Sequence, residues 1–466
     1  MAFVAKLPED ARLPQLAVAT DLAAMQNLLQ KSLPGFAEGR RLVDKLEITA
    51  CDYKPGRKCS LSYKLHVSDL QTGKTGQQIL IGVMDANGGA LQKMARMQNG
   101  ALTAPEFVPS LHLLPEQKIL LWGFPNDPKI KHLSALVAPE RLRVLLHEHW
   151  SALKLPPEIT LREVRTSVVK YAPQTRCTLR HVLFLETADG LQHSELVLYS
   201  KIFSSKTSVK PLFRKLQALW QAPVCHSGAL LIPEPVICDA TLNVIFQRGL
   251  QGRNVDQLLP HADLAAIAAS SGAMLAQFHQ TAFERLEQRS PEHELYDCEK
   301  ILARLAESAP EHLARAQKLE GELRERFARL TPLAPAPLHG AFRLTQLLLV
   351  EDRLALIDFD DLVQGNPISE VGGFIAYLLY LPLKGLSTEA QCHTAIANFC
   401  NAYRTHAPWG LPQDALQWYT AAYLLCRETK KCLEKSNKVS KRDYEGMIAK
   451  LLALAEEIGA GRMQLE

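Results

Sequence analysis

The residues best suited to chemistry gather in one stretch of the sequence, 337–361. His339 opens it, Gln346 stands before an apolar run, and Asp358 and Asp360 follow a second apolar run. Carboxylate and amide oxygens are the ligands that a hard cation prefers, but an Asp after a strand also commonly caps a turn. The residue types alone therefore leave both interpretations of Asp358 open.

Strands and turns come earlier in the chain, in an order that occurs twice. Alternating apolar residues and turn-forming clusters predict a three-stranded meander at 46–84, and a second at 164–203. The pattern Tyr-x-Pro-x-x-x-Cys begins at Tyr53 and again at Tyr171, an offset of 118 residues. This register favours an internal duplication of a unit of roughly 100 residues over a chance likeness.

Beyond residue 253 the apolar spacing becomes helical, interrupted only by a Pro-rich joint and the stretch at 337–361. Strands that precede helices, instead of alternating with them, predict an α+β fold. We expect four parts in the chain. They are an N-terminal leader with a short helix (1–41), a first strand-rich module (42–150), a second one (160–252) and a helical region (253–466).

The motif at 337–361 resembles the core of the aminoglycoside phosphotransferase and choline kinase superfamily. The family pattern is His-Gly-Asp, four residues, Asn or Gln, and an apolar hairpin that ends in Asp-Phe-Asp; this chain has His339-Gly340-Ala341, then Gln346, then Asp358-Phe359-Asp360. The Gln resembles maltokinase-like branches more than the aminoglycoside enzymes. The resemblance implies a two-lobe protein-kinase-like fold, with an antiparallel-sheet small lobe and a helical large lobe, preceded here by an additional small-lobe-like module.

The resemblance also implies an ATP and Mg²⁺ site. Asp358 and Gln346 would hold the metal, and Lys201, on a strand of the second module, would neutralise phosphate oxygens. Arg176 would reach the phosphates from a turn. The hinge between the lobes, at Gln247, Arg248 and Gly249, would contact the adenine through its backbone.

Two departures from the family pattern stand out. Ala341 occupies the position of the general-base Asp, and alanine cannot accept a proton; losing such a group typically costs about 10²–10⁴ in rate. The expected helix at 209–221, like the residues from 206 that lead into it, contains no Asp or Glu, so the usual acidic partner of Lys201 has no candidate there. In the first module, Met84 falls near the register of Lys201, which predicts no phosphate binding by that module.

These departures give two hypotheses. The first is a degenerate family member, a pseudokinase or scaffold, which binds ATP and Mg²⁺ with weak or no phosphotransfer. The second is an active small-molecule kinase in which Asp360 or a water replaces the base, with a sugar-like or other small polar hydroxyl compound as acceptor. The first module would then cap the cleft or bind a protein partner, and the sequence does not choose between these roles.

Composition excludes other classes of protein. Hydrophobic residues make up 47% of the 466 residues, and the formal net charge is only +4, too small to indicate nucleic-acid binding. Runs long enough for a membrane span and a secretory leader are not evident. Ten cysteines without Cys-x-x-Cys spacing indicate reduced, mostly buried thiols, and we expect a cytoplasmic protein.

A basic stretch lies near the C-terminus, at residues 427–442. It holds seven Lys or Arg against two Glu. A solvated helix face is one interpretation, and a surface for an anionic substrate or partner is the other.

Overall fold

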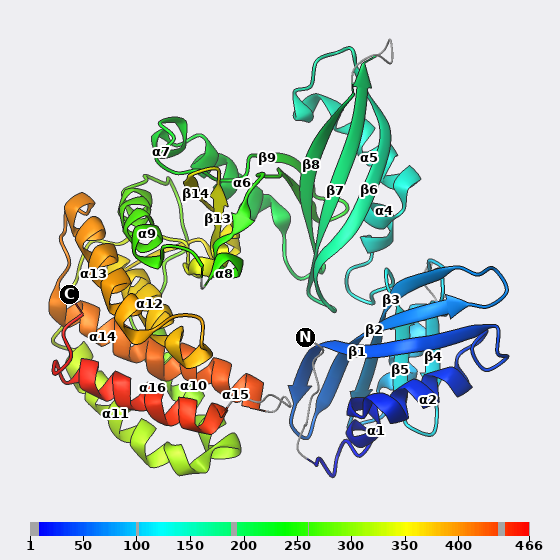
Figure 1. Ribbon diagram of the computed structural model, residues 1–466, viewed down its shortest axis with the longest axis horizontal. Helices are drawn as coiled ribbons and strands as arrows, with labels where there is room; N and C mark the ends of the chain where they lie inside the picture. Colours follow the sequence, from blue (N-terminus) through cyan, green and yellow to red (C-terminus); the bar gives the residue numbers. More distant parts are fainter. Residues whose placement is uncertain (1–8, 99–101, 188–192, 260, 437–442, 466) are drawn as a thin grey trace. The chain divides into compact units, whose positions relative to one another are not determined.

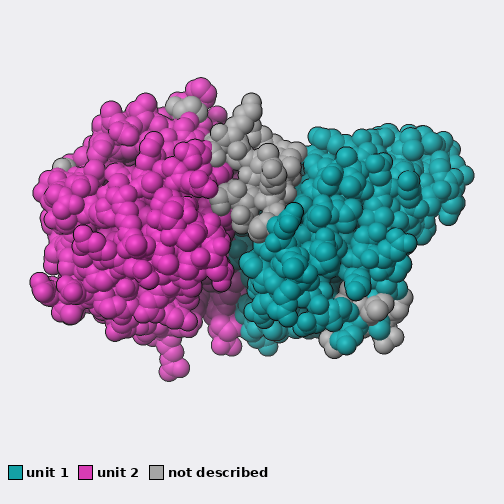
Figure 2. All heavy atoms as spheres, turned by 90° about the horizontal axis from the view of Figure 1, so that it is seen from below, with its two compact units in different colours: residues 1–210, 236–248, 437–441 teal, residues 211–235, 249–436, 442–466 magenta. Residues whose placement is uncertain are grey.

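The computed structural model describes residues 9–98, 102–187, 193–259, 261–436 and 443–465. Two compact units form, and each is described by itself (Figure 2). Unit 1 comprises Met1–Lys210, Val236–Arg248 and Asn437–Lys441, and unit 2 comprises Pro211–Pro235, Gly249–Ser436 and Arg442–Glu466.

Unit 1 contains two five-stranded antiparallel sheets (Figure 1). The first has the strand order β1-β2-β3-β5-β4, and the second has the order β6-β7-β8-β10-β9. The strands of the first are β1 (Arg41–Lys54), β2 (Lys58–Asp69), β3 (Thr75–Asp85), β4 (Leu111–Leu114) and β5 (Ile119–Gly123). Those of the second are β6 (Ile159–Ala172), β7 (Arg176–Thr187), β8 (His193–Phe203), β9 (Pro235–Asp239) and β10 (Val244–Arg248).

The first three strands have the same lengths in both sheets, 14, 12 and 11 residues. Strand β7 shows why they form, because every second residue from Cys177 to Leu185 is buried while its neighbours are not. Such alternation places one face of a strand in the core and the other outside it. The two predicted meanders are thus confirmed as strands, β1 to β3 in the first sheet and β6 to β8 in the second.

Each sheet is covered by the two helices that precede it in the sequence (Figure 1). Helices α1 (Leu16–Thr20) and α2 (Leu22–Ser32) contribute to the apolar core of the first sheet, and α4 (Leu133–Val137) and α5 (Pro139–Glu148) to that of the second. Asp21 caps the start of helix α2, because its carboxylate accepts hydrogen bonds from two backbone N–H groups of the first turn. The core of the first sheet therefore includes residues that the sequence assigned to a leader.

One carboxylate anchors each sheet at the turn between its first two strands. Asp127 accepts hydrogen bonds from the Tyr171 hydroxyl and the Gln174 N–H, both at 2.7 Å. Asp10 accepts the matching pair from the Tyr53 hydroxyl at 2.9 Å and the Gly56 N–H at 2.7 Å. This contact explains the tyrosine of the repeated pattern.

Unit 2 is mostly helical, with a small sheet and a two-stranded ladder (Figure 1). Its strands are β11 (Arg253–Asn254), β12 (Ala336–Leu338), β13 (Leu347–Val350), β14 (Arg353–Leu356) and β15 (Val363–Gly365). The helices entirely within it are α7 (Pro223–His226), α8 (Val255–Leu258), α9 (Leu264–His279), α10 (His293–Ser308), α11 (Leu313–Phe327), α12 (Pro367–Tyr380), α13 (Glu389–His406), α14 (Gln413–Tyr423), α15 (Thr429–Ser436) and α16 (Tyr444–Gly459). Antiparallel sheets followed by helices confirm the α+β fold class.

Two further helices are α3 (Ala90–Gln98), beside the first sheet, and α6 (Val209–Trp220), which runs from unit 1 into unit 2. All ten cysteines are free thiols, and seven are buried. Among the described residues, no helix combines the length and the apolar character that a membrane crossing requires.

We expect Asp127→Ala to lower the free energy of unfolding by about 1–3 kcal/mol, because it leaves the Tyr171 hydroxyl and a turn N–H without their acceptor. Asp10→Ala is the matched control: Asp10 is more exposed than the buried Asp127, so water replaces its oxygens at lower cost. Urea unfolding of both variants measures the difference. If Asp10→Ala lowers the free energy of unfolding as much as Asp127→Ala or more, the burial of Asp127 does not make its hydrogen bonds more important for stability.

Candidate functional site

The hairpin β13–β14 brings Gln346 and Asp358 together. Leu347 pairs with Leu356 at its end, and the Ile357 N–H donates to the Gln346 carbonyl oxygen at 3.0 Å. Gln346 and Asp358 therefore lie at the same end of one hairpin, although 12 positions separate them in the sequence. Gln346 is buried, and Asp358 is half-buried.

A buried carboxylate holds the loop that precedes this hairpin. Glu370, on α12, accepts hydrogen bonds from the backbone N–H groups of His339 at 2.8 Å and Gly340 at 2.7 Å. Its Oε2 also contacts His279 Nε2 at 3.2 Å. Burial opposes ionisation of Glu370, but the His279 contact and the backbone donors outweigh it, so the pKa of Glu370 is lowered.

Two histidines, His279 and His339, are structural parts of this arrangement. His279 Nδ1 lies 2.9 Å from the Tyr403 hydroxyl, which also accepts from Trp409 Nε1 at 3.1 Å. His339 Nε2 lies 2.9 Å from the Ile357 carbonyl oxygen, and burial lowers the pKa of His339. A neutral His339 that donates to this carbonyl joins the loop to the strand before Asp358.

Gly340 is required by both backbone conformation and space. Its φ of +84° lies in the left-handed region, and a Cβ there would lie 2.4 Å from the Asp361 carbonyl oxygen. The loop thus packs directly against the Asp358–Asp361 turn. Ala341, the next residue, is half-buried, and its N–H lies 3.3 Å from His339 Nδ1.

The donor set at the end of the hairpin is suited to Mg²⁺. Asp358 offers a carboxylate and Gln346 an amide oxygen, and Mg²⁺ in nucleotide sites is typically held by one or two carboxylates together with phosphate oxygens. Asp358 itself has a φ of +72°, which Asp tolerates better than most residues. Asp360 is half-buried in the short turn Phe359–Asp361. The described residues contain no group of three His, Cys, Asp or Glu arranged for a metal.

Four of the predicted nucleotide-binding residues lie on the second sheet of unit 1. Lys201 pairs with Thr178 of β7 and Ile245 of β10, and Arg176 begins β7. Gln247 and Arg248 end β10, and the Arg248 guanidinium donates to the Leu153 carbonyl oxygen at 2.9 Å. Gly249, the remaining hinge residue, belongs to unit 2 with Asp358, Asp360 and Gln346.

The core cluster that joins α4 and α5 to the second sheet includes Leu198 and Ile202 of β8. Alternation along the strand places Lys201 on the opposite face. In the first sheet the equivalent position is Val83, because Val83 pairs with Ser60 as Lys201 pairs with Thr178. The register predicted for Met84 is therefore one residue off: Met84 lies in the core with α1 and α2, and Val83 in a second apolar cluster with Trp122.

Lys215 makes a contact that the sequence does not predict. Its ammonium group donates to the Leu362 carbonyl oxygen at 3.1 Å, next to the Asp358–Asp361 turn. Helix α6, which contains no acidic residue, thus places the positive charge of Lys215 beside this turn. A hydrogen bond between residues 147 positions apart leaves no local sequence signal.

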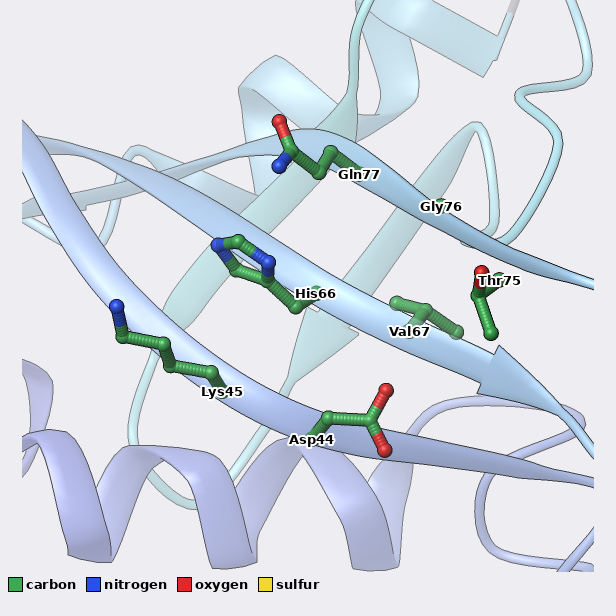
Figure 3. Close-up of a pocket in the computed structure, with 7 residues that line it drawn as sticks. All are labelled: Asp44, Lys45, His66, Val67, Thr75, Gly76 and Gln77. Carbon is green, nitrogen blue, oxygen red and sulfur yellow. The ribbon is translucent and has the colours of Figure 1, made fainter.

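A hollow of about 350 Å³ lies on the first sheet, away from any predicted residue (Figure 3). Lys45, His66 and Gln77 lie side by side in it, on β1, β2 and β3. Both Lys45 Nζ and His66 Nε2 contact the Glu47 carboxylate at 2.9 Å, so their polar atoms are already partnered.

Comparisons with known proteins support the superfamily that the motif predicts. Residues 182–409 match the model of the phosphotransferase enzyme family, a segment that includes Lys201, Gln346 and Asp358. The search of curated proteins found no match.

Solved structures of kinases are similar to the chain at low identity. A thermostable mutant of an aminoglycoside phosphotransferase, in a ternary complex with ADP and hygromycin B, is 14% identical over 69% of this chain and 98% of its own, with a TM-score of 0.44. A choline kinase from Cryptosporidium parvum Iowa II is 10% identical over 69% and 95%, with a TM-score of 0.44. A choline/ethanolamine kinase family protein from Mesorhizobium loti is 15% identical over 59% and 84%, with a TM-score of 0.37.

We expect Glu370→Gln to lower the free energy of unfolding at neutral pH by about 1.5–3 kcal/mol, since one amide oxygen cannot replace a carboxylate that accepts from three groups. The pKa of Glu370 is lowered on folding, so its stabilisation is complete above the ordinary value of 4.5 and is lost as the pH falls through the lowered pKa. Glu370→Gln should therefore flatten the acid side of the stability profile. Urea unfolding from pH 7 to pH 3 measures this.

The matched control is Glu322→Gln, on the exposed side of α11, where we expect less than about 0.5 kcal/mol at any pH. The pKa of His339 is lower in the folded chain than in the unfolded chain, so the unfolded chain binds a proton here at a higher pH. His339 therefore destabilises the fold in acid, both in the wild type and in Glu370→Gln. An unchanged acid profile in Glu370→Gln would show that this carboxylate does not hold the loop.

Proposed function

We propose that this protein is a degenerate phosphotransferase-family member, nearest to maltokinase-like branches, that binds ATP with Mg²⁺ and transfers phosphate weakly or not at all. One observation carries the proposal. The loop that would present the catalytic base is fully held in place by Glu370, yet its base position is occupied by Ala341. Loss of the base within an ordered loop is compatible with retained binding and reduced chemistry.

The nucleotide would lie against the second sheet. Lys201 would neutralise phosphate oxygens from β8, and Arg176 would reach them from the start of β7. The backbone at Gln247, Arg248 and Gly249 would contact adenine. What supports these roles is that all but Arg176 lie in the segment matched by the family model.

Asp358 and Gln346 would hold Mg²⁺ at the end of the β13–β14 hairpin. When bound, the ion would supply positive charge to the phosphate oxygens of the nucleotide. Helix α6, on which the family pattern would place an acidic residue, carries no Asp or Glu.

The two sheets of unit 1 support our inference of an internal duplication. Strand order, the lengths of three strands and the Asp–Tyr anchor all recur, with the repeats beginning near Asp10 and Asp127. The second repeat and the helical region at 253–466 would form the two lobes. The first repeat would bind no nucleotide, since Val83 replaces Lys201 within an apolar cluster.

Ten free thiols fit a reducing compartment, and we propose a cytoplasmic location on that ground.

An active kinase for a sugar-like or other small polar hydroxyl compound is the second candidate. Asp360 favours it, because its carboxylate lies in the turn that packs on Gly340, one residue before Ala341. Asp360 would then act as the base in place of residue 341. Acceptor-dependent ADP release that Asp360→Asn abolishes and Ala341→Gly preserves would favour this candidate.

We expect ATP with Mg²⁺ to raise the midpoint of thermal unfolding, and Asp358→Asn to abolish the Mg²⁺-dependent part of that shift. Asn tolerates the left-handed conformation of residue 358, so the variant should fold while losing the charge that binds the cation. Asp352→Asn, at the exposed tip of the same hairpin, is the control and should keep the full shift. No shift at millimolar nucleotide in the wild type would overturn the proposed binding.

We expect Ala341→Asp to raise the rate of ADP release from ATP by about 10²-fold or more over the wild type, since it restores the carboxylate to a loop that is already ordered. A coupled ADP assay with and without a panel of sugars measures the gain. The double variant Ala341→Asp/Asp358→Asn should show none. Wild-type turnover that matches Ala341→Asp would contradict degeneracy and favour the second candidate.

A further inference from the structure

Two lysines of unit 2 lie against two buried tyrosines of α12, and two arginines lie near Lys431. We call them the cationic cluster; its members are Arg343, Lys384, Arg427 and Lys431. The Lys431 ammonium lies 5.2 Å from the ring centroid of Tyr377 and 5.8 Å from that of Tyr380. The Lys384 ammonium lies 5.6 Å and 5.9 Å from the same two rings. All four distances are within the range of cation–π attraction.

Glu428 is the carboxylate that holds two members of the cluster. It is fully buried, accepts from Lys431 Nζ at 2.7 Å with each oxygen, and accepts from Arg427 Nε at 3.0 Å. A single π-helical turn, Leu424–Glu428, ends at this residue, and such turns are frequent at functional sites. Burial lowers the pKa of Lys431 to about 8, even though Glu428 acts in the opposite direction.

Arg343 is the member of the cluster that lies next to the loop that carries Ala341. It lies two residues after Ala341, and its positive charge is one of the smaller causes that lower the pKa of Tyr377 and of Lys431. Its Nε is buried and has no hydrogen-bond partner among the residues that the structure describes. A buried guanidinium N–H without an acceptor is costly, which makes an external acceptor favourable at this point.

Helix α12 sets the geometry between loop and cluster. Glu370, Gly373 and Tyr377 recur at spacings of three and four residues, so they lie along one side of the helix. Glu370 holds the loop, the Gly373 carbonyl oxygen accepts from the Arg427 guanidinium, and the Tyr377 ring contacts Lys431. A Cβ at Gly373 would lie only 3.2 Å from an Arg427 nitrogen, so glycine makes room for this contact.

The carboxylates that the structure describes beside the cluster already have partners. Glu428 accepts from Lys431 and Arg427, and Asp256 accepts from the Tyr377 hydroxyl. An anion that lies among the basic groups would be attracted by their positive charge. The basic stretch at 427–442 is therefore not a solvated face in its first turns, since Arg427 and Lys431 are about four-fifths buried.

We propose that the cationic cluster binds the anionic group of a small molecule, a phosphate or a carboxylate, beside the loop that carries Ala341. The inference deepens the proposed function by naming the class of ligand on the acceptor side of the site. It rests on the proposed function, because that function is what makes the bound molecule an acceptor. Arg343 offers a planar fork that matches phosphate and carboxylate oxygens, and Lys431 and Lys384 add point charges over an aromatic floor. A cationic acceptor would meet four like charges there.

The test uses the full-length protein, with inorganic phosphate and malonate as probes at constant ionic strength. We expect a saturable rise in the thermal midpoint with either probe. Arg343→Gln should weaken the apparent affinity at least tenfold. Lys318→Gln, an exposed lysine of α11, is the matched control and should leave the affinity unchanged. No saturable shift in the wild type, or an unchanged affinity in Arg343→Gln, overturns the proposal.

Lys431 requires a paired substitution, because Lys431→Gln alone leaves Glu428 buried with one partner fewer. The double variant Lys431→Gln/Glu428→Gln removes the pair together and should also lose phosphate affinity by tenfold or more. Retained affinity in this double variant, if it unfolds at the wild-type temperature, would count against Lys431 and the cluster.

Two further measurements separate this inference from the nucleotide proposal. Lys201→Ala should weaken the ATP-dependent shift, Asp358→Asn should lose the Mg²⁺-dependent part of it, and both should keep the phosphate affinity. Arg343→Gln should keep the ATP-dependent shift and weaken the phosphate affinity. Loss of phosphate affinity in Lys201→Ala and Asp358→Asn would place the anion in the nucleotide site and overturn the cluster. Glycerol 3-phosphate should bind at least tenfold more tightly than glycerol, and equal binding would show that the anionic group is not recognised.

Discussion

The candidate site depends on one buried carboxylate. Glu370 accepts two backbone N–H groups of the loop and contacts His279, and it is removed from water on a fully buried helix. Burying a charge is costly unless partners replace the lost hydration, and these three contacts do so. Because the donors are main-chain groups, the loop has one position in which the charge is satisfied. His279, Tyr403 and Trp409 extend this constraint to α13.

The same helix transmits that constraint to the basic groups of unit 2. Gly373 and Tyr377 follow Glu370 along one side of α12 and contact Arg427 and Lys431. A change in the position of α12 would therefore move the loop and the cationic cluster together. Ala341 alters none of these contacts, since only its backbone N–H takes part. The framework of the site can thus persist when the side chain at position 341 is lost.

Local patterns predicted the parts of the fold that local forces determine. Alternating apolar residues predicted the two meanders, and the Tyr-x-Pro-x-x-x-Cys pattern predicted equivalent turns in both sheets. The hairpin that brings Gln346 to Asp358 followed from two apolar runs and a turn. Contacts across long stretches of chain were not predictable, because the acceptor of Tyr171 lies 44 residues away and that of Lys215 lies 147 away. The sequence identifies Arg427 and Lys431 only as members of a basic stretch, because composition does not reveal that Glu428 is buried beside them.

The two sheets show how one framework can serve two purposes. Both keep the carboxylate that fixes the first turn, so this anchor is part of the framework itself. At the position equivalent to Lys201, the first sheet has Val83 packed with Trp122, Ile81 and Leu120. An unpaired ammonium in such surroundings would be costly, whereas valine adds apolar contact. The first sheet therefore has apolar packing at the position where the second sheet carries a lysine.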